Sequence, residues 1–361
     1  MNAPVSIRDV AAHAGVSVGT VSNVLNRPEI VARTTRDRVH AAIKALGFVR
    51  NESARQLRAG RSRTIGLVVL DVANPFFTDV ARGVEDVASM SGLAVILCNT
   101  DERLDKEERY LELLEEHRVQ GILITPVANA DGRLIALQRR GTPVILVDSR
   151  SPSGRQCSVA VDDVLGGEAA MTHLLAEGHE RISFVGGPVS LRQVADRRDG
   201  AVRALVRAGR PAVDLEVIET SGLNVAAGQR VGAEIAALPP RQRPTAAFCA
   251  NDLVALGLLQ EMTRHRIRVP DDLAIVGYDD IEFAAAAAVP LSSVRQPRQE
   301  PGRMAAQLLL EEALGHEGHK HRQVIFQPEL EVRQSSQARP RPARSRRVPR
   351  QSAEDVAAPA S

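Results

Sequence analysis

The chain has 361 residues, of which 44% are hydrophobic and 2% aromatic, a composition that fits two or three globular domains. It has no run of eighteen apolar residues and no apolar segment behind basic residues at its start, so we expect neither a transmembrane helix nor a secretory signal, and a cytoplasmic location. Cys98, Cys157 and Cys249 form no CxxC pair, and we interpret them as reduced, mostly buried thiols rather than disulfides or a zinc site.

The net charge of +2 conceals an uneven distribution along the chain. Residues 1–61 carry a net charge of +6 and residues 336–361 carry +4, which leaves −8 for residues 62–335. A basic head on an acidic body is the pattern expected when only the head meets a polyanion such as DNA.

The N-terminal fifty residues have the signature of three short helices. SIRD at residues 6–9 forms a capping box for a first helix, which we expect to end at Gly15. Ser17 is a second N-cap, before VGTVSNVLN, and the glycine turn between the two helices predicts a helix-turn-helix. For a third helix, ending at Gly47, the sequence predicts a capping box in TTRD at residues 34–37.

The outward face predicted for the second helix carries short hydroxyl and amide side chains and no Glu or Lys: Thr20, Ser22, Asn23 and Asn26. Asn can pair with adenine through two hydrogen bonds, and Ser or Thr can bind phosphate oxygens. The alternative is a three-helix bundle that merely packs on another surface. The basic charge and the glycine turn favour DNA binding.

After the head, apolar runs of strand length alternate with amphipathic segments of helix length. We predict a first helix over residues 76–90 and strands at residues 64–70, 93–98, 121–125, 143–147, 181–185, 246–250 and 273–277. Near-continuous apolar strands are buried on both faces, which indicates parallel sheets covered by helices. The sequence therefore predicts an α/β body of doubly wound parallel sheets.

A doubly wound sheet binds ligands beyond the carboxyl ends of its strands. At those positions the sequence has adjacent aromatic residues, Phe76 and Phe77, together with amides and carboxylates: Asp71, Asn74, Asp148, Asn251, Asp252, Asp279 and Asp280. Rings stack on apolar sugar faces and carboxylates accept hydrogen bonds from hydroxyls, so this set favours a small polyol. The alternative is structural: Asp279 as a helix cap and Asn74 in the turn before Pro75.

Sequence motifs of catalysis are missing. There is no GxGxxG after a strand, no GxxxxGKS/T and no GxSxG. The run HEGHKH contains His316, His319 and His321 and could bind a metal, but it lies between a predicted helix and a predicted strand, and we expect a solvated loop. We therefore expect no enzyme, no cofactor and no metal.

Three segments in combination resemble the lactose-repressor (LacI/GalR) family of bacterial transcriptional regulators: SIRDVAAHAGVSVGTVSNVLN, ARQLRAGRSRTIGLVVLDVANPFF and GHERISFVGG. The similarity runs from residue 6 to about residue 333. It implies a helix-turn-helix domain at residues 1–50, a hinge helix at 51–63 and, at 64–335, a two-lobed body similar to periplasmic sugar-binding proteins. We expect a disordered basic tail at 336–361, whose arginines either add non-specific DNA affinity or only solubilise the chain.

The same resemblance implies roles for individual residues. Bases would be read by Val18, Gly19 and Asn23, while phosphates or the helix start would be held by Ser17, Thr20, Ser22 and Asn26. Leu57 would insert between base steps in the minor groove, with Arg55 in the turn beneath it and facing phosphates. The effector would contact Asn74, Phe76, Phe77, Asp148, Arg197, Asn251, Asp279 and Gln296, and Leu223 falls near a position that is often aromatic in sugar binders.

From this we expect a repressor that binds a palindromic operator as a homodimer, since one helix-turn-helix reads only a few base pairs. Its effector would be a small molecule, by expectation a sugar. The effector could either release the dimer from its operator or recruit it, because both outcomes use the same domains. Two other classes are a cytoplasmic small-solute-binding protein with a degenerate head and a sugar-modifying enzyme on the same body. The basic head disfavours the first, and the lack of a poised nucleophile or base disfavours the second.

Overall fold

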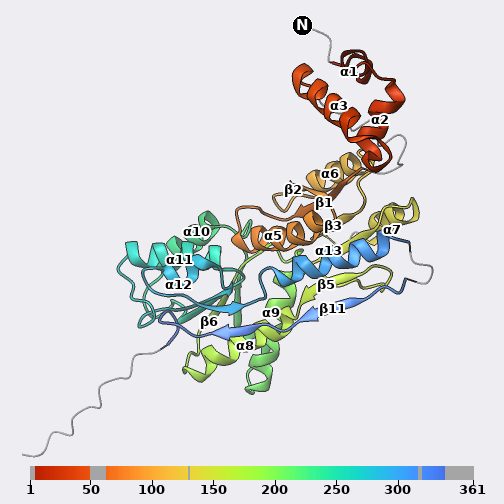
Figure 1. Ribbon diagram of the computed structural model, residues 1–361. Helices are drawn as coiled ribbons and strands as arrows, with labels where there is room; N and C mark the ends of the chain where they lie inside the picture. Colours follow the sequence, from red (N-terminus) through yellow and green to blue (C-terminus); the bar gives the residue numbers. More distant parts are fainter. Residues whose placement is uncertain (1–4, 49–61, 129–130, 316–318, 338–361) are drawn as a thin grey trace, which may run out of the picture. The chain divides into compact units, whose positions relative to one another are not determined.

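The computed structural model describes residues 5–48, 62–128, 131–315 and 319–337. The chain divides into two compact units, Met1–Arg63 and Thr64–Ser361 (Figure 1). Residues 51–61 of the predicted hinge helix, with Arg55 and Leu57, and the predicted tail from residue 338 onward lie outside the described residues. Within the described residues, no helix is both long and apolar enough to cross a bilayer.

The first unit is a head of three α-helices around a small apolar core. Its elements are α1 (Ile7–Ala14), α2 (Val18–Asn26), the 3-10 helix η1 (Pro28–Ile30) and α3 (Arg33–Leu46). Val10, Val21 and Val39, one from each α-helix, are fully buried at the centre. These helices confirm the predicted helix-turn-helix.

The ends of the head helices follow the sequence signals in all but one place. The Asp9 carboxylate accepts hydrogen bonds from the Ser6 N–H and hydroxyl at 2.8 and 2.7 Å, and Ser17 Oγ accepts one from the Thr20 N–H at 3.0 Å. The box predicted at residues 34–37 is wrong: α3 begins at Arg33, so both threonines lie inside its first turn. Its N-cap is Ala32, which has no side chain able to cap.

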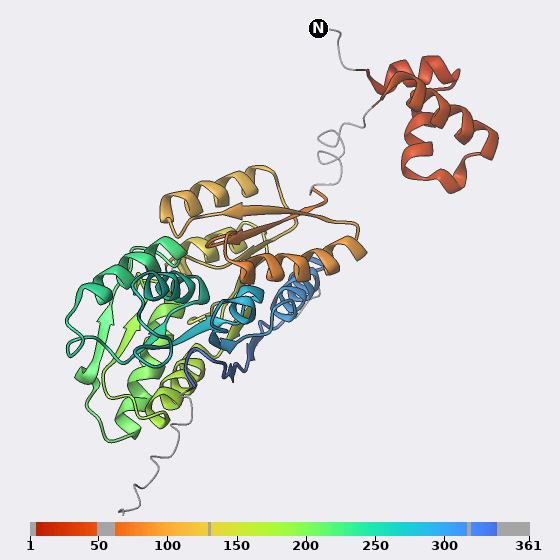
Figure 2. The same cartoon turned by 90° about the vertical axis from the view of Figure 1, so that its left-hand side faces the viewer.

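The second unit contains two lobes, each a six-stranded sheet covered by helices on both faces (Figure 2). The first lobe has the strand order β11-β5-β4-β3-β1-β2, with all neighbours parallel. Its elements are β1 (Thr64–Val69), α5 (Pro75–Met90), β2 (Ala94–Asn99), α6 (Leu104–Glu116), β3 (Ile122–Ile124), α7 (Asp131–Arg139), β4 (Val144–Val147), β5 (Ser158–Val161), α13 (Glu300–Ala313) and β11 (Gln323–Phe326).

The second lobe has the strand order β12-β10-β9-β8-β6-β7. Its elements are α8 (Asp163–Ala176), β6 (Ile182–Val185), α9 (Arg192–Arg207), η2 (Ala212–Asp214), β7 (Leu215–Ile218), α10 (Val225–Ala237), β8 (Ala246–Cys249), α11 (Asp252–Arg264), β9 (Ala274–Asp279), α12 (Glu282–Ala286), β10 (Ser292–Arg295) and β12 (Glu329–Glu331). The chain therefore crosses between lobes three times: after β5, after β10 and after β11.

All seven predicted strands are present, with ends that differ by at most two residues. Five strands were missed: β5, β7, β10, β11 and β12. They are short, and their sequences mix apolar with polar residues, as in EVI of β7 and SSVR of β10. The predicted parallel sheets are confirmed, and one antiparallel pair is added at an edge of the second sheet, where β12 runs antiparallel to β10.

The body also extends one residue beyond the predicted boundary at residue 335. Ser336 is fully buried, and its hydroxyl lies 2.7 Å from Ser292 Oγ and 2.7 Å from His173 Nε2. A serine-rich stretch resembles a polar tail in sequence, but here its hydroxyls are hydrogen-bonded inside the second lobe.

Each of three helix pairs meets at reciprocal glycines. In α8 and α9, a Cβ on Gly167 would lie 2.0 Å from the Arg197 carbonyl oxygen, and one on Gly200 would lie 2.1 Å from the Val164 carbonyl oxygen. The α5–α13 and α10–α11 pairs have the same arrangement, at Gly83 with Gly302 and at Gly228 with Gly257. A chain with 2% aromatic residues thus builds its core by bringing helix backbones close together.

We predict that Gly167→Ala destabilises the body by roughly 1–3 kcal/mol, because the added methyl group forces α8 away from α9. The free energy lost in this packing exceeds the gain in helix propensity of about 1 kcal/mol. Gly132→Ala in α7 is the matched control, since a Cβ there has no neighbour within 4 Å. Urea denaturation of both variants measures the difference. Equal unfolding midpoints for the two variants would contradict the close packing.

Candidate functional site

In the head, α2 presents the side chains that the sequence assigned to DNA. Ser17 Oγ lies 2.9 Å from Thr20 Oγ1, and Asn26 Nδ2 donates to the Ser22 carbonyl oxygen at 2.8 Å. Val18 is 42% exposed, and Asn23 is exposed with no side-chain hydrogen bond to any described residue. An amide held on a rigid helix without an internal partner is suited to pair with a base edge.

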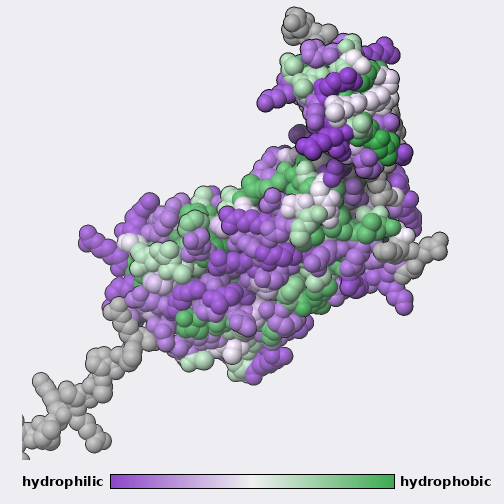
Figure 3. All heavy atoms as spheres, viewed as in Figure 1, coloured by the Kyte–Doolittle hydropathy of each residue, from purple (hydrophilic) through white to green (hydrophobic). Residues whose placement is uncertain are grey.

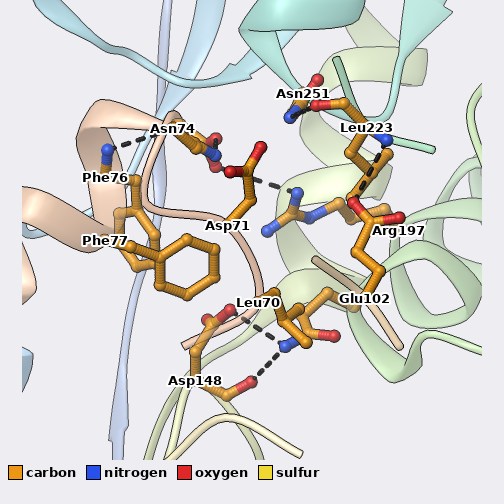
Figure 4. Close-up of a pocket in the computed structure, with 12 residues that line it drawn as sticks. Leu70, Asp71, Asn74, Phe76, Phe77, Glu102, Asp148, Arg197, Leu223 and Asn251 are labelled. Atoms are coloured by element: carbon orange, nitrogen blue, oxygen red, sulfur yellow. Dashed lines mark hydrogen bonds and ion pairs between the residues drawn. The ribbon is translucent and has the colours of Figure 1, made fainter. Parts of the chain in front are cut away.

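In the body, a cavity lies between the lobes at the carboxyl ends of the strands (Figure 4). Its lining contains seven of the eight predicted effector residues: Asn74, Phe76, Phe77, Asp148, Arg197, Asn251 and Asp279. The two phenylalanine rings meet edge to face, with centroids 5.2 Å apart, and lie across the cavity from the polar side chains of the second lobe. This arrangement places an apolar wall opposite hydrogen-bonding groups.

The eighth residue, Gln296, does not line the cavity. It is 1% exposed and its Nε2 donates to Asp279 Oδ1 at 2.6 Å. Gln296 lies at a crossover between the lobes, just after β10. The structure thus gives it the position of a support behind Asp279 rather than of a ligand contact.

Three further lining residues were missed: Leu70, Glu102 and Gln193. The rule that ligands bind beyond strand ends would have found Leu70 after β1 and Glu102 after β2. Gln193 carries a different signal, because it precedes Arg197 by four residues in α9 and so lies on the same helix face.

Hydrogen bonds across the cavity join the two lobes. Asn74 caps α5 in the first lobe with its Oδ1, while its Nδ2 donates to Asp279 Oδ2 of the second lobe at 2.9 Å. Gln193 of the second lobe donates to the carbonyl and to Oδ2 of Asp148 in the first, at 2.8 and 3.0 Å. The structure is therefore one in which the lobes are closed on each other.

Arg197 is the buried cation of the cavity. Its Nε donates to Asp163 Oδ1 at 2.8 Å, its Nη1 lies 3.8 Å from Asp279 Oδ1, and its guanidinium stacks on the Tyr278 ring at 3.7 Å. Burial raises the pKa of Asp148, Asp163 and Asp279, and the positive charge of Arg197 opposes that shift. The acidic cavity is thus held together around one guanidinium.

Two acceptor atoms in this lining lack a donor. Among the described residues, no hydrogen-bond partner reaches Asp148 Oδ1 or Gln193 Oε1, although both atoms are buried. Buried polar atoms normally have hydrogen-bond partners. Two acceptors without donors at a cavity wall therefore suit a ligand that carries hydroxyl groups.

Glu102 forms another contact between lobes, because its Oε1 accepts a hydrogen bond from the Leu223 N–H at 3.2 Å. Burial raises the pKa of Glu102 to about 7, the Leu223 N–H opposes the shift, and the neighbouring charge of Asp71 adds to it. The folded, closed state therefore binds the Glu102 proton more tightly than the unfolded chain does. It follows that stability falls as pH rises from about 4.5 to about 7 and then no longer depends on this group.

We predict that Glu102→Gln removes this part of the pH dependence, because a neutral amide still offers an oxygen to the Leu223 N–H. The variant should be more stable than the unchanged chain at pH 8, and the difference should shrink toward pH 5. Thermal unfolding of both proteins across this range measures it, and other buried carboxylates cancel in the comparison. Parallel curves would show that ionised Glu102 carries no penalty in the closed state.

Comparisons with known proteins agree with both parts of the chain. Residues 6–51 match the bacterial regulatory proteins of the lacI family, and residues 171–336 match a periplasmic binding protein-like domain. The HTH-type transcriptional repressor PurR of Aliivibrio fischeri (strain ATCC 700601 / ES114) is 34% identical, over 91% of this chain and 98% of that protein. The repressor CytR of Escherichia coli (strain K12) is 32% identical, over 93% of this chain and 97% of that protein.

Solved structures give the same result. A lac repressor dimer bound to operator and the anti-inducer ONPF has a TM-score of 0.79 at 26% identity, and covers 93% of this chain and 100% of its own. A complex of the transcriptional regulator CelR with cellobiose has a TM-score of 0.67 at 30% identity. The similarity covers 92% of this chain and 99% of CelR. These relatives are transcriptional repressors or, for CelR, a transcriptional regulator, and not enzymes. The chain belongs to the lacI family of bacterial transcriptional regulators.

Proposed function

We propose that this repressor binds a palindromic operator in the bacterial cytoplasm as a homodimer, and that a small sugar in the body cavity controls its affinity for DNA. The observation that supports a sugar is that one cavity is lined both by the Phe76 and Phe77 rings and by two unpaired buried acceptors, Asp148 Oδ1 and Gln193 Oε1. Rings pack on the C–H face of a sugar, and its hydroxyls donate to the acceptors. The cellobiose in the CelR complex supports the same ligand class.

Control of DNA affinity follows from the position of the cavity between the lobes. A ligand that replaces the Asn74–Asp279 or Gln193–Asp148 hydrogen bonds changes the balance between open and closed lobes. It shifts the equilibrium only by its difference in affinity for the two states. Whether the sugar releases the operator or strengthens its binding depends on which lobe arrangement the DNA-bound dimer has.

A homodimer is supported by apolar side chains at the surface of the first lobe. On the edge strand β2 and the helix α6, Leu97, Leu104 and Leu113 are 41–46% exposed, and Figure 3 shows apolar atoms at the surface over this region. Exposed apolar side chains of this kind are typical of protein interfaces. Two copies would bring two heads to the two halves of a palindrome.

For the DNA contact, we propose base reading by Val18, Gly19 and Asn23, with Ser17, Thr20, Ser22 and Asn26 holding phosphates or the helix start. Leu57 would insert in the minor groove, and Arg55 would face the phosphates. Asn23→Ala should weaken binding to a duplex selected from a random palindromic library by about 1–3 kcal/mol, while non-specific binding stays unchanged. His40→Ala, on the exposed face of α3, is the control. Binding that does not weaken as salt rises would overturn phosphate contact by the head.

For the effector, a thermal-shift screen with pentoses, hexoses, disaccharides and purine nucleosides should find stabilisation by a sugar, because only the folded state binds it. Asp148→Asn should abolish the shift at the same sugar concentration, and with it the effect of the sugar on operator binding. Asp86→Asn, on the exposed part of α5, is the control. Stabilisation by nucleosides but not by free sugars would replace the proposed ligand class, and an unchanged shift in Asp148→Asn would remove Asp148 from the site.

A further inference from the structure

A second polar cluster lies in the first lobe, away from the effector cavity. It consists of Cys157, Glu312, His319 and His321, one ligand atom from each lying within 4.8 Å of all the others. The four residues come from three segments: the start of β5, the end of α13 and the approach to β11. Figure 1 shows these elements alongside one another.

The distances within this cluster have the dimensions of a metal site. Cys157 Sγ lies 3.2 Å from His319 Nε2 and 3.8 Å from His321 Nδ1, and Glu312 Oε2 lies 3.7 and 3.8 Å from the same two nitrogens. Ligands at zinc bond lengths of about 2.0–2.3 Å in a tetrahedron are about 3.3–3.8 Å apart. Four of the six distances among these atoms thus lie in or near the tetrahedral range, and all six are within 4.8 Å, so movements of about an ångström or less would let the four atoms surround one ion.

The atoms around the cluster are arranged like the outer shell of a metal site. The Arg322 N–H points at Cys157 Sγ at 3.4 Å, and Gln138 Nε2 donates to Glu312 Oε1 at 3.2 Å, which turns the other carboxylate oxygen toward the histidines. Glu312 Oε2 is buried, and among the described residues no donor satisfies it by a hydrogen bond. Such outer contacts orient ligands and support a thiolate.

We propose that Cys157 Sγ, Glu312 Oε2, His319 Nε2 and His321 Nδ1 bind one Zn²⁺ ion in a tetrahedral, structural site. One thiolate, two imidazoles and one carboxylate form a ligand set that Zn²⁺ prefers over Mg²⁺ or Ca²⁺, which take oxygen ligands. Four protein ligands leave no open position for a substrate. The expectation of a solvated histidine loop treated the histidines without Cys157, which is distant in sequence but adjacent in the fold.

The ion would link the end of α13 and the segment before β11 to Cys157 at the start of β5. Glu312 ends the helix that returns from the second lobe, and the two histidines lead into β11, whose pairing with β5 begins at Gln323 and Ser158. A bond from this segment to Cys157 holds β11 at the sheet edge. Because the ion binds the folded state and not the unfolded chain, it stabilises the folded state by mass action.

The test uses the full chain without an affinity tag, purified and dialysed against metal-free buffer. We expect one equivalent of Zn²⁺ per chain by elemental analysis. Co²⁺ in its place should give the intense visible bands of tetrahedral coordination and a near-ultraviolet thiolate charge-transfer band. Removing the metal with a chelator should lower the unfolding temperature, and adding Zn²⁺ should restore it. A weak octahedral Co²⁺ spectrum without the thiolate band, measured on the chain without substitutions, would contradict tetrahedral coordination that includes Cys157.

Variants locate the ion. Cys157→Ser and His319→Ala should each weaken Zn²⁺ binding by more than about 100-fold. Gln138→Ala removes the hydrogen bond to Glu312 together with a longer one to the Val144 carbonyl oxygen, and should weaken binding by about 10-fold or more. Two matched controls should bind as the unchanged chain does: Cys98→Ser, which changes another buried thiol of the same lobe, and His265→Ala, at the residue that caps the end of α11. Equal binding by all five variants would overturn the assignment, whatever their stability.

Discussion

The charge of Arg197 is the constraint on which the body of this repressor depends. A guanidinium that is 3% exposed is costly to bury unless several acceptors surround it, and the structure supplies Asp163, the Ala250 carbonyl oxygen and the nearby Asp279. The same cation allows carboxylates to gather in a buried interface. Its positive charge opposes the cost of burying Asp148 and Asp279 in one cavity with two aromatic rings.

Arg197 also depends on packing at a distance from its charge. Its own carbonyl oxygen lies against Gly167, so the closeness of α8 and α9 fixes where the helix directs the side chain. One face of α9 then carries both Gln193 and Arg197 into the cavity. Small residues in the core and polar residues in the site are therefore parts of one arrangement, and a change in either displaces the other.

Much of this arrangement follows from local sequence. The seven apolar strands and the side chains that follow them predicted the fold class and most of the cavity lining, because parallel strands deliver their carboxyl ends to one edge. Local sequence does not reveal contacts made between distant segments. Leu223 contributes its backbone N–H to Glu102, Gln296 supports Asp279 from a crossover, and Cys157 meets two histidines more than 160 residues away. Nothing in the residues near each of these positions encodes its partner.

The order of strands in the first lobe has a consequence for synthesis on the ribosome. The sheet that contains β1 also contains β11, and α13 covers part of one of its faces. Both β11 and α13 come from the last sixth of the chain before the tail. While the second lobe emerges, the nascent first lobe must therefore keep β5 unpaired on one side and leave uncovered the part of its sheet over β3, β4 and β5 that α13 later covers. Long-range closure of this kind slows folding and exposes the intermediate to aggregation. A chain interrupted before residue 323 contains every residue that lines the effector cavity, yet it lacks the edge strand of the first lobe.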